Sequence, residues 1–250
     1  MPRLGTNFET HKIGGSGFTF SGVRVDTLGA TDYTLVTIMI DVTGSVGNFA
    51  AQLLLMLQTA IQACKKSPRS DNILVRVCVF SSMHPKGVLE LHGFKQLADI
   101  DPANDYAPFN PRGSTPLYAA TFSAFGATNT YAKTLRDQDF GVNAILFVIT
   151  DGDDTDGGVT MKMIADEQVR ARTAEELESL VTILIGVNAA ASQQWLDVFT
   201  AQAGFTHYIP VDDATPGKFA KLAGFISHSV SSTAQAQGTG GPSQNINPTI

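Results

Sequence analysis

The sequence predicts an α/β fold in which a mainly parallel β-sheet carries helices on both faces. Continuous apolar runs of strand length recur along the chain, which is typical of strands buried on both faces of a parallel sheet. Helical patterns separate most of these runs, and parallel strands joined by right-handed crossovers place helices on both faces. Two of the apolar runs end on an aspartate, Asp41 and Asp151.

Composition limits the classes of function. The chain has 250 residues, of which 43% are hydrophobic and 16% are charged, enough for one large domain with a full core. The formal net charge of −6, without a run of Lys and Arg, argues against a nucleic-acid partner. No apolar stretch approaches the roughly 20 residues that span a bilayer, and the N-terminus lacks the apolar segment of a signal peptide. We therefore expect no membrane partner and a cytoplasmic location, or a virus particle assembled in the cytoplasm.

Residues 1–32 are rich in Gly, Thr and Ser and predict an N-terminal arm that packs on the main domain or reaches a neighbouring molecule. The main domain is expected over residues 33–232. It begins with the strand "LVTIMI", and a helical pattern follows over 46–66. The next strand is "NILVRVCVF". The alternating "GVLELHGF" predicts an antiparallel edge strand. Cys64 and Cys78 lie within these apolar patterns and are expected to be buried free thiols.

The second half of the chain continues the alternation of strands and helices. A polar, proline-rich loop over 95–115 is longer than an ordinary connection, and such loops tend to be functional. Helices are expected over 116–135, 160–180, 192–204 and 215–232, and strands over 143–150, 180–187 and 206–211. Residues 233–250 are polar without apolar periodicity and predict a flexible C-terminal tail.

Oxygen-bearing side chains are predicted to gather at one edge of the sheet. Ligands of such sheets bind beyond the carboxyl ends of the strands, where both strand-terminal aspartates fall. The loop "DVTGS" offers Asp41, Thr43 and Ser45 at alternate positions, "RGSTPLY" offers Thr115, and "ITDGDDTDGG" begins with Asp151. Because these loops supply no sulfur or imidazole, the set suits hard cations such as Mg²⁺, Mn²⁺ or Ca²⁺. Neutral hydroxyl ligands would leave the metal able to accept an anionic ligand from outside.

These residues resemble the metal-ion-dependent adhesion site (MIDAS) of von Willebrand factor type A (VWA) domains. The family pattern is Asp-x-Ser-x-Ser on a first loop, Thr on a second and Asp on a third. Asp41 and Ser45 match the ends of the first motif, and Thr43 replaces its middle serine with a residue that keeps the hydroxyl and adds a methyl group. Thr115 and Asp151 stand where the second and third loops have their ligands. The resemblance runs from about residue 33 to residue 231.

The resemblance implies a three-layer, Rossmann-like VWA fold with a mainly parallel six-stranded sheet and one antiparallel edge strand. It also implies that a divalent cation, Mg²⁺ before Mn²⁺ or Ca²⁺, binds a protein partner that supplies an Asp or Glu side chain. The implied function is a metal-dependent binding module in an intracellular multiprotein assembly, and not an enzyme. Partners could then include an AAA+ ATPase or further copies of the chain.

Other interpretations remain open at this point. Asp41 and Asp151 could cap the helices that follow them, and Ser114 could point inward in place of Thr115. Asp153, Asp154 and Asp156 are expected to form a solvated acidic rim, and Trp195 is expected to anchor the core. The alternative function is a structural subunit, for example of a virion, whose arm and tail contact neighbouring copies.

Overall fold

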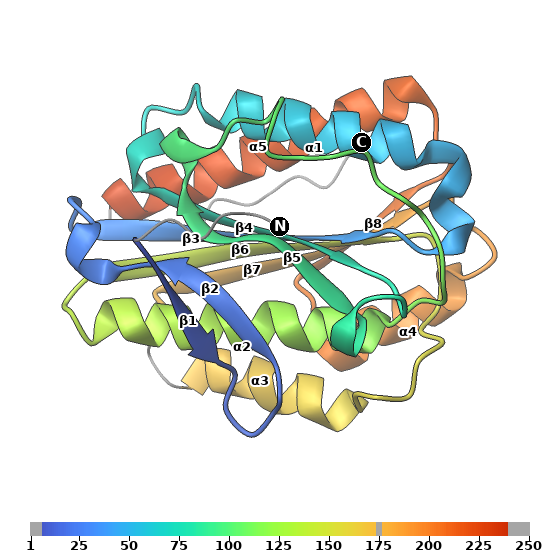
Figure 1. Ribbon diagram of the computed structural model, residues 1–250, viewed down its shortest axis with the longest axis horizontal. Coiled ribbons are helices and arrows are strands. Elements are labelled where there is room, and N and C mark those ends of the chain that lie inside the picture. Colours follow the sequence, from blue (N-terminus) through green and yellow to red (C-terminus); the bar gives the residue numbers. More distant parts are fainter. Residues whose placement is uncertain (1–6, 174–176, 240–250) are drawn as a thin grey trace.

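A computed structural model describes residues 7–173 and 177–239 as a sheet between two helical layers (Figure 1). Helices α1 and α5 cover one face of the sheet, and α2, α3 and α4 cover the other. The helices are α1 Ala50–Cys64, α2 Leu117–Arg136, α3 Met161–Thr173, α4 Gln193–Ala203 and α5 Pro216–Thr239. The strands are β1 Phe8–Lys12, β2 Thr19–Val23, β3 Asp32–Asp41, β4 Ile73–Phe80, β5 Val88–Gln96, β6 Gly141–Thr150, β7 Ser179–Val187 and β8 His207–Val211. No helix in the described part of the chain is both long and apolar enough to cross a membrane.

The sheet has the strand order β1-β2-β5-β4-β3-β6-β7-β8. Strands β4, β3, β6, β7 and β8 are parallel, and β5 is antiparallel to β4, as the sequence predicts. The sheet has eight strands where six were expected, because the N-terminal hairpin adds β1 and β2 beyond β5. The central position of β3 places Asp41 between the carboxyl ends of β4 and β6.

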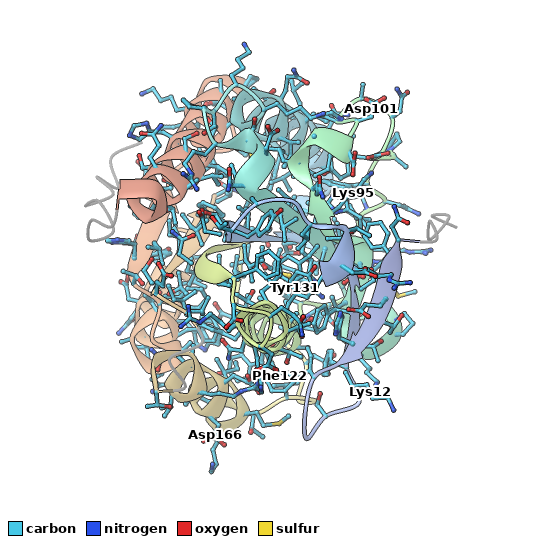
Figure 2. All side chains as sticks on the ribbon, turned by 90° about the vertical axis from the view of Figure 1, so that its left-hand side faces the viewer. Lys12, Lys95, Asp101, Phe122, Tyr131 and Asp166 are labelled. Carbon is cyan, nitrogen blue, oxygen red and sulfur yellow. The ribbon has the colours of Figure 1, made fainter. Side chains whose placement is uncertain are left out.

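The N-terminal hairpin packs on its own domain. Strand β2 pairs with β5 at one position, Gly22 with Phe94, so most of its attachment comes from side chains. Ile13 is fully buried against α2, and the Tyr131 hydroxyl donates a 2.5 Å hydrogen bond to the Val23 carbonyl. In Figure 2 the hairpin lies beside α2, whose Tyr131 and Phe122 are labelled. Residues 8–23 are therefore an integral part of this fold.

The carboxylate of Glu90, which is paired with Arg76, joins the hairpin to the sheet. Arg76 on β4 is almost fully buried, and its Nε donates to Glu90 Oε2 on β5 at 2.8 Å. The other oxygen of Glu90 accepts hydrogen bonds from the backbone N–H and the hydroxyl of Ser21 on β2. The carboxylate of Glu90 thus links β2 to Arg76 of β4.

Helix α5 runs to Thr239, beyond its expected end at residue 232. Asn143 on β6 donates a 2.8 Å hydrogen bond to the Thr233 carbonyl, and Ala234 and Ala236 are buried. The small side chains of these alanines let the end of α5 pack against the sheet, although most residues of the segment are polar. The expectation of a flexible tail from residue 233 is therefore wrong for 233–239, and its remainder lies outside the described residues.

Both cysteines are buried free thiols, as predicted. Cys64 ends α1, and Cys78 lies within β4. Burial raises the pKa of each thiol to about 12. Neither side chain is therefore ionised near neutral pH, and both act as small apolar core residues.

Candidate metal centre

Backbone hydrogen bonds hold three loops together at the carboxyl end of β3. Arg112 N–H donates to the Val42 carbonyl at 3.0 Å, and Gly44 N–H donates to the Gly113 carbonyl at 3.1 Å. Gly113 has φ +79°, and a Cβ there would lie 2.8 Å from Ser81 Oγ, so only glycine fits this close approach. On the other side, Thr155 N–H donates to the Thr115 carbonyl at 2.8 Å.

The structure brings all five predicted site residues together in one hydrogen-bonded chain. Thr43 Oγ1 lies 3.1 Å from Ser45 Oγ and 3.5 Å from Thr115 Oγ1. Ser45 Oγ donates to Asp151 Oδ1 at 2.8 Å, and Asp41 Oδ1 accepts from Thr43 N–H at 2.9 Å. Residues separated by as many as 110 positions thus place their side-chain oxygens in one cluster.

This oxygen cluster is open to solvent on one side. Asp41 and Thr43 are each 1% exposed, and Thr115 is 8% exposed. Ser45 is exposed and Asp151 is half-buried. The cluster, called the concavity below, therefore has a buried floor at Asp41 and Thr43, and a ligand from outside can approach past Ser45 and Asp151.

The geometry bears on two alternatives that the sequence left open, capping by Asp41 and the choice between Ser114 and Thr115. The 3-10 helix Gly44–Phe49 and the following α1 show no side-chain capping hydrogen bond at their N-termini. Ser114 is exposed, and its backbone N–H bonds to Ser82 Oγ at 2.9 Å, away from Thr43. Thr115, rather than Ser114, is the residue of the second loop whose hydroxyl lies in the concavity.

The two carboxylates of the concavity lack a compensating positive charge. Burial raises the pKa of Asp41 to about 7 against the hydrogen bonds from Thr43 and Thr150, and the negative charge of Asp151 raises it further. Burial also raises the pKa of Asp151. No Lys, Arg or His of the described residues contributes to either shift. A bound cation would supply the missing charge.

The donor set fits a hard divalent cation. The described residues contain no cluster of three or more His, Cys, Asp and Glu, so carboxylates alone do not form a metal site. The hydroxyls of Thr43, Ser45 and Thr115 add three neutral oxygens to the two carboxylates. Such an all-oxygen set suits Mg²⁺, Mn²⁺ or Ca²⁺ better than metals that prefer sulfur or imidazole.

Comparison with known families identifies the domain. The von Willebrand factor type A domain family matches residues 36–223. The chain therefore belongs to the VWA family. No curated protein matches it. VWA domains in general mediate protein–protein interactions, often through a metal ion at a MIDAS.

Solved structures share the VWA fold at low sequence identity. The pilus adhesin SpaC of Lactobacillus rhamnosus GG is 11% identical with a TM-score of 0.60, over 82% of this chain and 31% of the adhesin. Proximal thread matrix protein 1 of the mussel byssus, in a structure with a zinc-occupied MIDAS motif, is 15% identical with a TM-score of 0.48, over 80% of this chain and 46% of that protein. This VWA chain thus spans less than half of either relative.

The candidate metal centre includes residues that were not predicted from the sequence. Thr150 Oγ1 donates to Asp41 Oδ2 at 2.8 Å and so orients the buried carboxylate. A hydroxyl at the last position of an apolar strand, directly before Asp151, is the signal that could have identified it. Asp154 was expected on a solvated rim, but its Oδ1 accepts a 2.8 Å hydrogen bond from Tyr118 N–H in the first turn of α2. That expectation is wrong because the free N–H groups of the helix start recruit the carboxylate.

Proposed function

We propose that this VWA domain binds a divalent cation and, through it, an acidic side chain of a protein partner. Asp41, Thr43, Ser45, Thr115 and Asp151 would hold the cation, with Mg²⁺ the expected ion and Mn²⁺ or Ca²⁺ as alternatives. The observation that carries the proposal is the solvent-open concavity in which two carboxylates and three hydroxyls meet without a positive side chain.

The residues of the concavity have different proposed roles. Thr150 and the Thr43 N–H hold the Asp41 carboxylate in place, so the buried floor is fixed before a ligand arrives. Ser45 and Asp151 lie at the open side, where an incoming group passes. The cation, when bound, supplies positive charge and an acceptor position for a carboxylate oxygen of the partner.

We propose binding rather than catalysis, within an intracellular multiprotein assembly in which an AAA+ ATPase is one candidate partner. Both carboxylates of the concavity are assigned to the cation, which leaves neither to act as a general base. The alternative of a structural subunit that reaches neighbours with its arm gains no support from the hairpin, whose apolar residues Ile13, Phe20 and Val23 are buried in their own domain.

Calorimetric titration with Mg²⁺ and Mn²⁺ tests the metal site. We expect one ion per chain for the wild type and at least about a tenfold loss of affinity for Ser45→Ala and Asp41→Asn. Asp99→Asn is the matched control, because this exposed aspartate follows β5 at the opposite edge of the sheet. Equal affinity of Ser45→Ala, Asp41→Asn and the wild type would contradict the proposed site.

The partner step needs a separate measurement. A peptide with one central glutamate, followed by NMR, should bind in Mg²⁺ and lose binding in EDTA. The same peptide with glutamine in place of glutamate should not bind. Equal binding of the two peptides would exclude recognition of an acidic side chain by the metal.

A further inference from the structure

A groove lies between the N-terminal hairpin and β5, and we call it the hairpin groove. Its volume is about 860 Å³, and residues within 8–21 and 85–95 form its two sides. The strands β2 and β5 approach closely at one end, where a Cβ on Gly93 would overlap the Ser21 carbonyl, and their single pairing lies next to this contact. Before these positions no pairing joins the two strands, both of which lie within the described residues. The space between them has the size of a small-molecule site.

Apolar side chains line the hairpin groove from its open side inward. Leu89 of β5 is 42% exposed, and Val88 beside it is half-buried. Phe20 of β2 also lines the groove and is buried, so the groove reaches into the core. Phe18 is half-buried and packs edge-on against Phe122 of α2, with ring centroids 5.4 Å apart. A ligand with an apolar body would therefore bury this surface on binding.

The charged side chains of the hairpin groove leave one positive charge without a partner. Arg76 Nε lies 2.8 Å from Glu90 Oε2, and Lys95 Nζ lies 2.9 Å from Asp105 Oδ2. These two acids are the only ones that line the groove, and both are paired. Lys86 is the third cation of the lining, and it forms no ion pair within residues 7–173 and 177–239. The groove therefore favours an anionic group over a cationic one.

The ammonium group of Lys86 is held beside the apolar rings. Lys86 has φ +55°, and its Nζ donates a hydrogen bond across the groove to the Gly17 carbonyl. The same Nζ lies 5.6 Å from the centroid of the Phe18 ring, a cation–π contact. An ammonium has three N–H donors, so the bond to Gly17 leaves others for a ligand. Because Lys86 is exposed, an anion from solvent reaches a charge that is already positioned.

We propose that the hairpin groove binds a small amphipathic carboxylate, with the carboxylate on Lys86 and the apolar body against Phe18 and Leu89. The carboxylate accepts charge-assisted hydrogen bonds from the ammonium. One free ammonium balances a single negative charge, which favours a carboxylate over a phosphate dianion. None of the five residues of the concavity lines the groove, so this binding needs no metal ion and goes beyond the proposed function.

Decanoate, decanol and decylamine are suitable probes, because they share one alkyl chain and differ in charge. Each is titrated into the isotope-labelled full chain in EDTA, below the concentration at which it aggregates, and binding is followed by NMR. We expect decanoate to shift the amide signals of Phe18, Val88 and Leu89. Its affinity should exceed that of decanol by about tenfold, and decylamine should bind more weakly than decanol.

Variants assign the charge preference to one residue. Lys86→Gln should remove the preference for decanoate over decanol, and Lys86→Arg should retain it. Lys66→Gln, at an exposed lysine after α1, is the matched control and should behave like the wild type. Leu89→Ser should weaken decanoate and decanol alike, because it removes apolar surface and no charge. Unchanged amide signals of the central strand β3 would show that each variant is folded.

Several results would overturn the inference. The first is equal affinity of the wild type for the three probes, or no binding of decanoate. The second is a set of decanoate shifts that lies outside the groove, and the third is an undiminished preference for decanoate in Lys86→Gln. If a peptide that ends in a leucine carboxylate shifts the groove signals and decanoate does not, the occupant is a peptide and the inference is wrong. Because EDTA is present throughout, none of these results bears on the proposed metal site, which the titration with Mg²⁺ and Mn²⁺ tests separately.

Discussion

The carboxylate of Asp41 is costly to bury in the metal-free protein. It is 1% exposed, and burial together with the charge of Asp151 raises its pKa to about 7. An aspartate with a raised pKa in the folded state destabilises that state as the pH rises from about 4 toward 7, because the unfolded chain gives up the proton first. Retaining such a residue in the core is consistent with a role in binding.

Asp41→Asn should therefore have opposite effects with and without metal. At pH 8 in EDTA we expect the variant to be more stable than the wild type by on the order of 1 kcal/mol, because a buried charge is removed. In excess Mg²⁺ the wild type should gain stability through binding, and the variant should not. Urea unfolding of the wild type and the variant, in EDTA and in Mg²⁺, measures these differences in the free energy of unfolding. A wild type that is equally stable in EDTA and in Mg²⁺ would argue against a metal site.

Thr43 tests whether a hydroxyl is needed at the middle of the first loop. Thr43→Ser keeps the oxygen that lies 3.1 Å from Ser45 Oγ, whereas Thr43→Val keeps the shape and removes it. We expect Thr43→Ser to bind Mg²⁺ within about threefold of the wild type and Thr43→Val to bind at least about tenfold more weakly, as measured by calorimetry. Similar affinities for both variants would show that Thr43 is not a ligand.

Among single residues, the sequence predicted those whose side-chain oxygens form the cluster. The residues that hold these side chains in position were not predicted. The sequence shows where strands end and how residues are spaced in the loops. These local features predicted the five residues of the cluster, Asp41, Thr43, Ser45, Thr115 and Asp151. Thr150 and Asp154 act through contacts with residues 109 and 36 positions away. Such partners depend on how the loops pack and are not visible in a local pattern.

Among the larger elements, the long connection from β5 to α2 is held by a histidine–tyrosine contact. His92 Nε2 lies 2.8 Å from the Tyr106 hydroxyl, and Nδ1 lies 2.9 Å from the Gly93 carbonyl. Since a carbonyl only accepts, Nδ1 carries the proton and Nε2 accepts from Tyr106 in the neutral ring. Burial lowers the pKa of His92 to about 4. The neutral ring thus anchors the loop that leads to Thr115.

Acid should weaken this anchor. The unfolded chain takes up a proton on this histidine near pH 6.5 and the folded chain only near pH 4, so the contribution of His92 to stability is lost as the pH falls between these values. We expect His92→Gln to reduce the dependence of the free energy of unfolding on pH in that window. Urea unfolding at several pH values measures it, with the exposed His228→Gln as control. An unchanged pH dependence in His92→Gln would contradict the assignment.

The sequence predicted most helices and strands because their apolar periodicity is local. The sequence did not decide whether the N-terminal segment packs on its own domain or reaches a neighbouring molecule. The residues that hold the hairpin, Tyr131 and Glu90, lie 108 and 69 residues from their partners in it. The last turns of α5 were missed because alanines among Gln, Ser and Thr give little periodic signal, and the decisive contact comes from Asn143.

For the whole molecule, the hairpin and the sheet share one hydrophobic core. Ile13, Phe20 and Val23 belong to the same buried cluster as residues of β3, α2 and α4. A Cβ added to Gly126 would lie 2.5 Å from Ile13 Cγ2, which shows how closely the hairpin approaches α2. The hairpin should therefore unfold together with the rest of the domain.

Ile13→Ala tests this cooperativity. Removing a fully buried side chain should lower the free energy of unfolding by about 2–5 kcal/mol in a single transition. Val169→Ala, at a side chain that is 55% exposed, is the control and should change little. Thermal unfolding followed by circular dichroism measures both. An early separate transition in Ile13→Ala would show that the hairpin is an independent arm.

The burial of both native thiols has a practical consequence for spectroscopy. Because Cys64 and Cys78 resist ionisation, maleimide reagents should leave the wild-type chain unmodified under mild conditions. Met83, 53% exposed on the loop that contacts Gly113, can then be replaced as Met83→Cys and coupled to a nitroxide or a dye without first removing the natural cysteines. A label at this position would allow distances to be measured from the open side of the concavity.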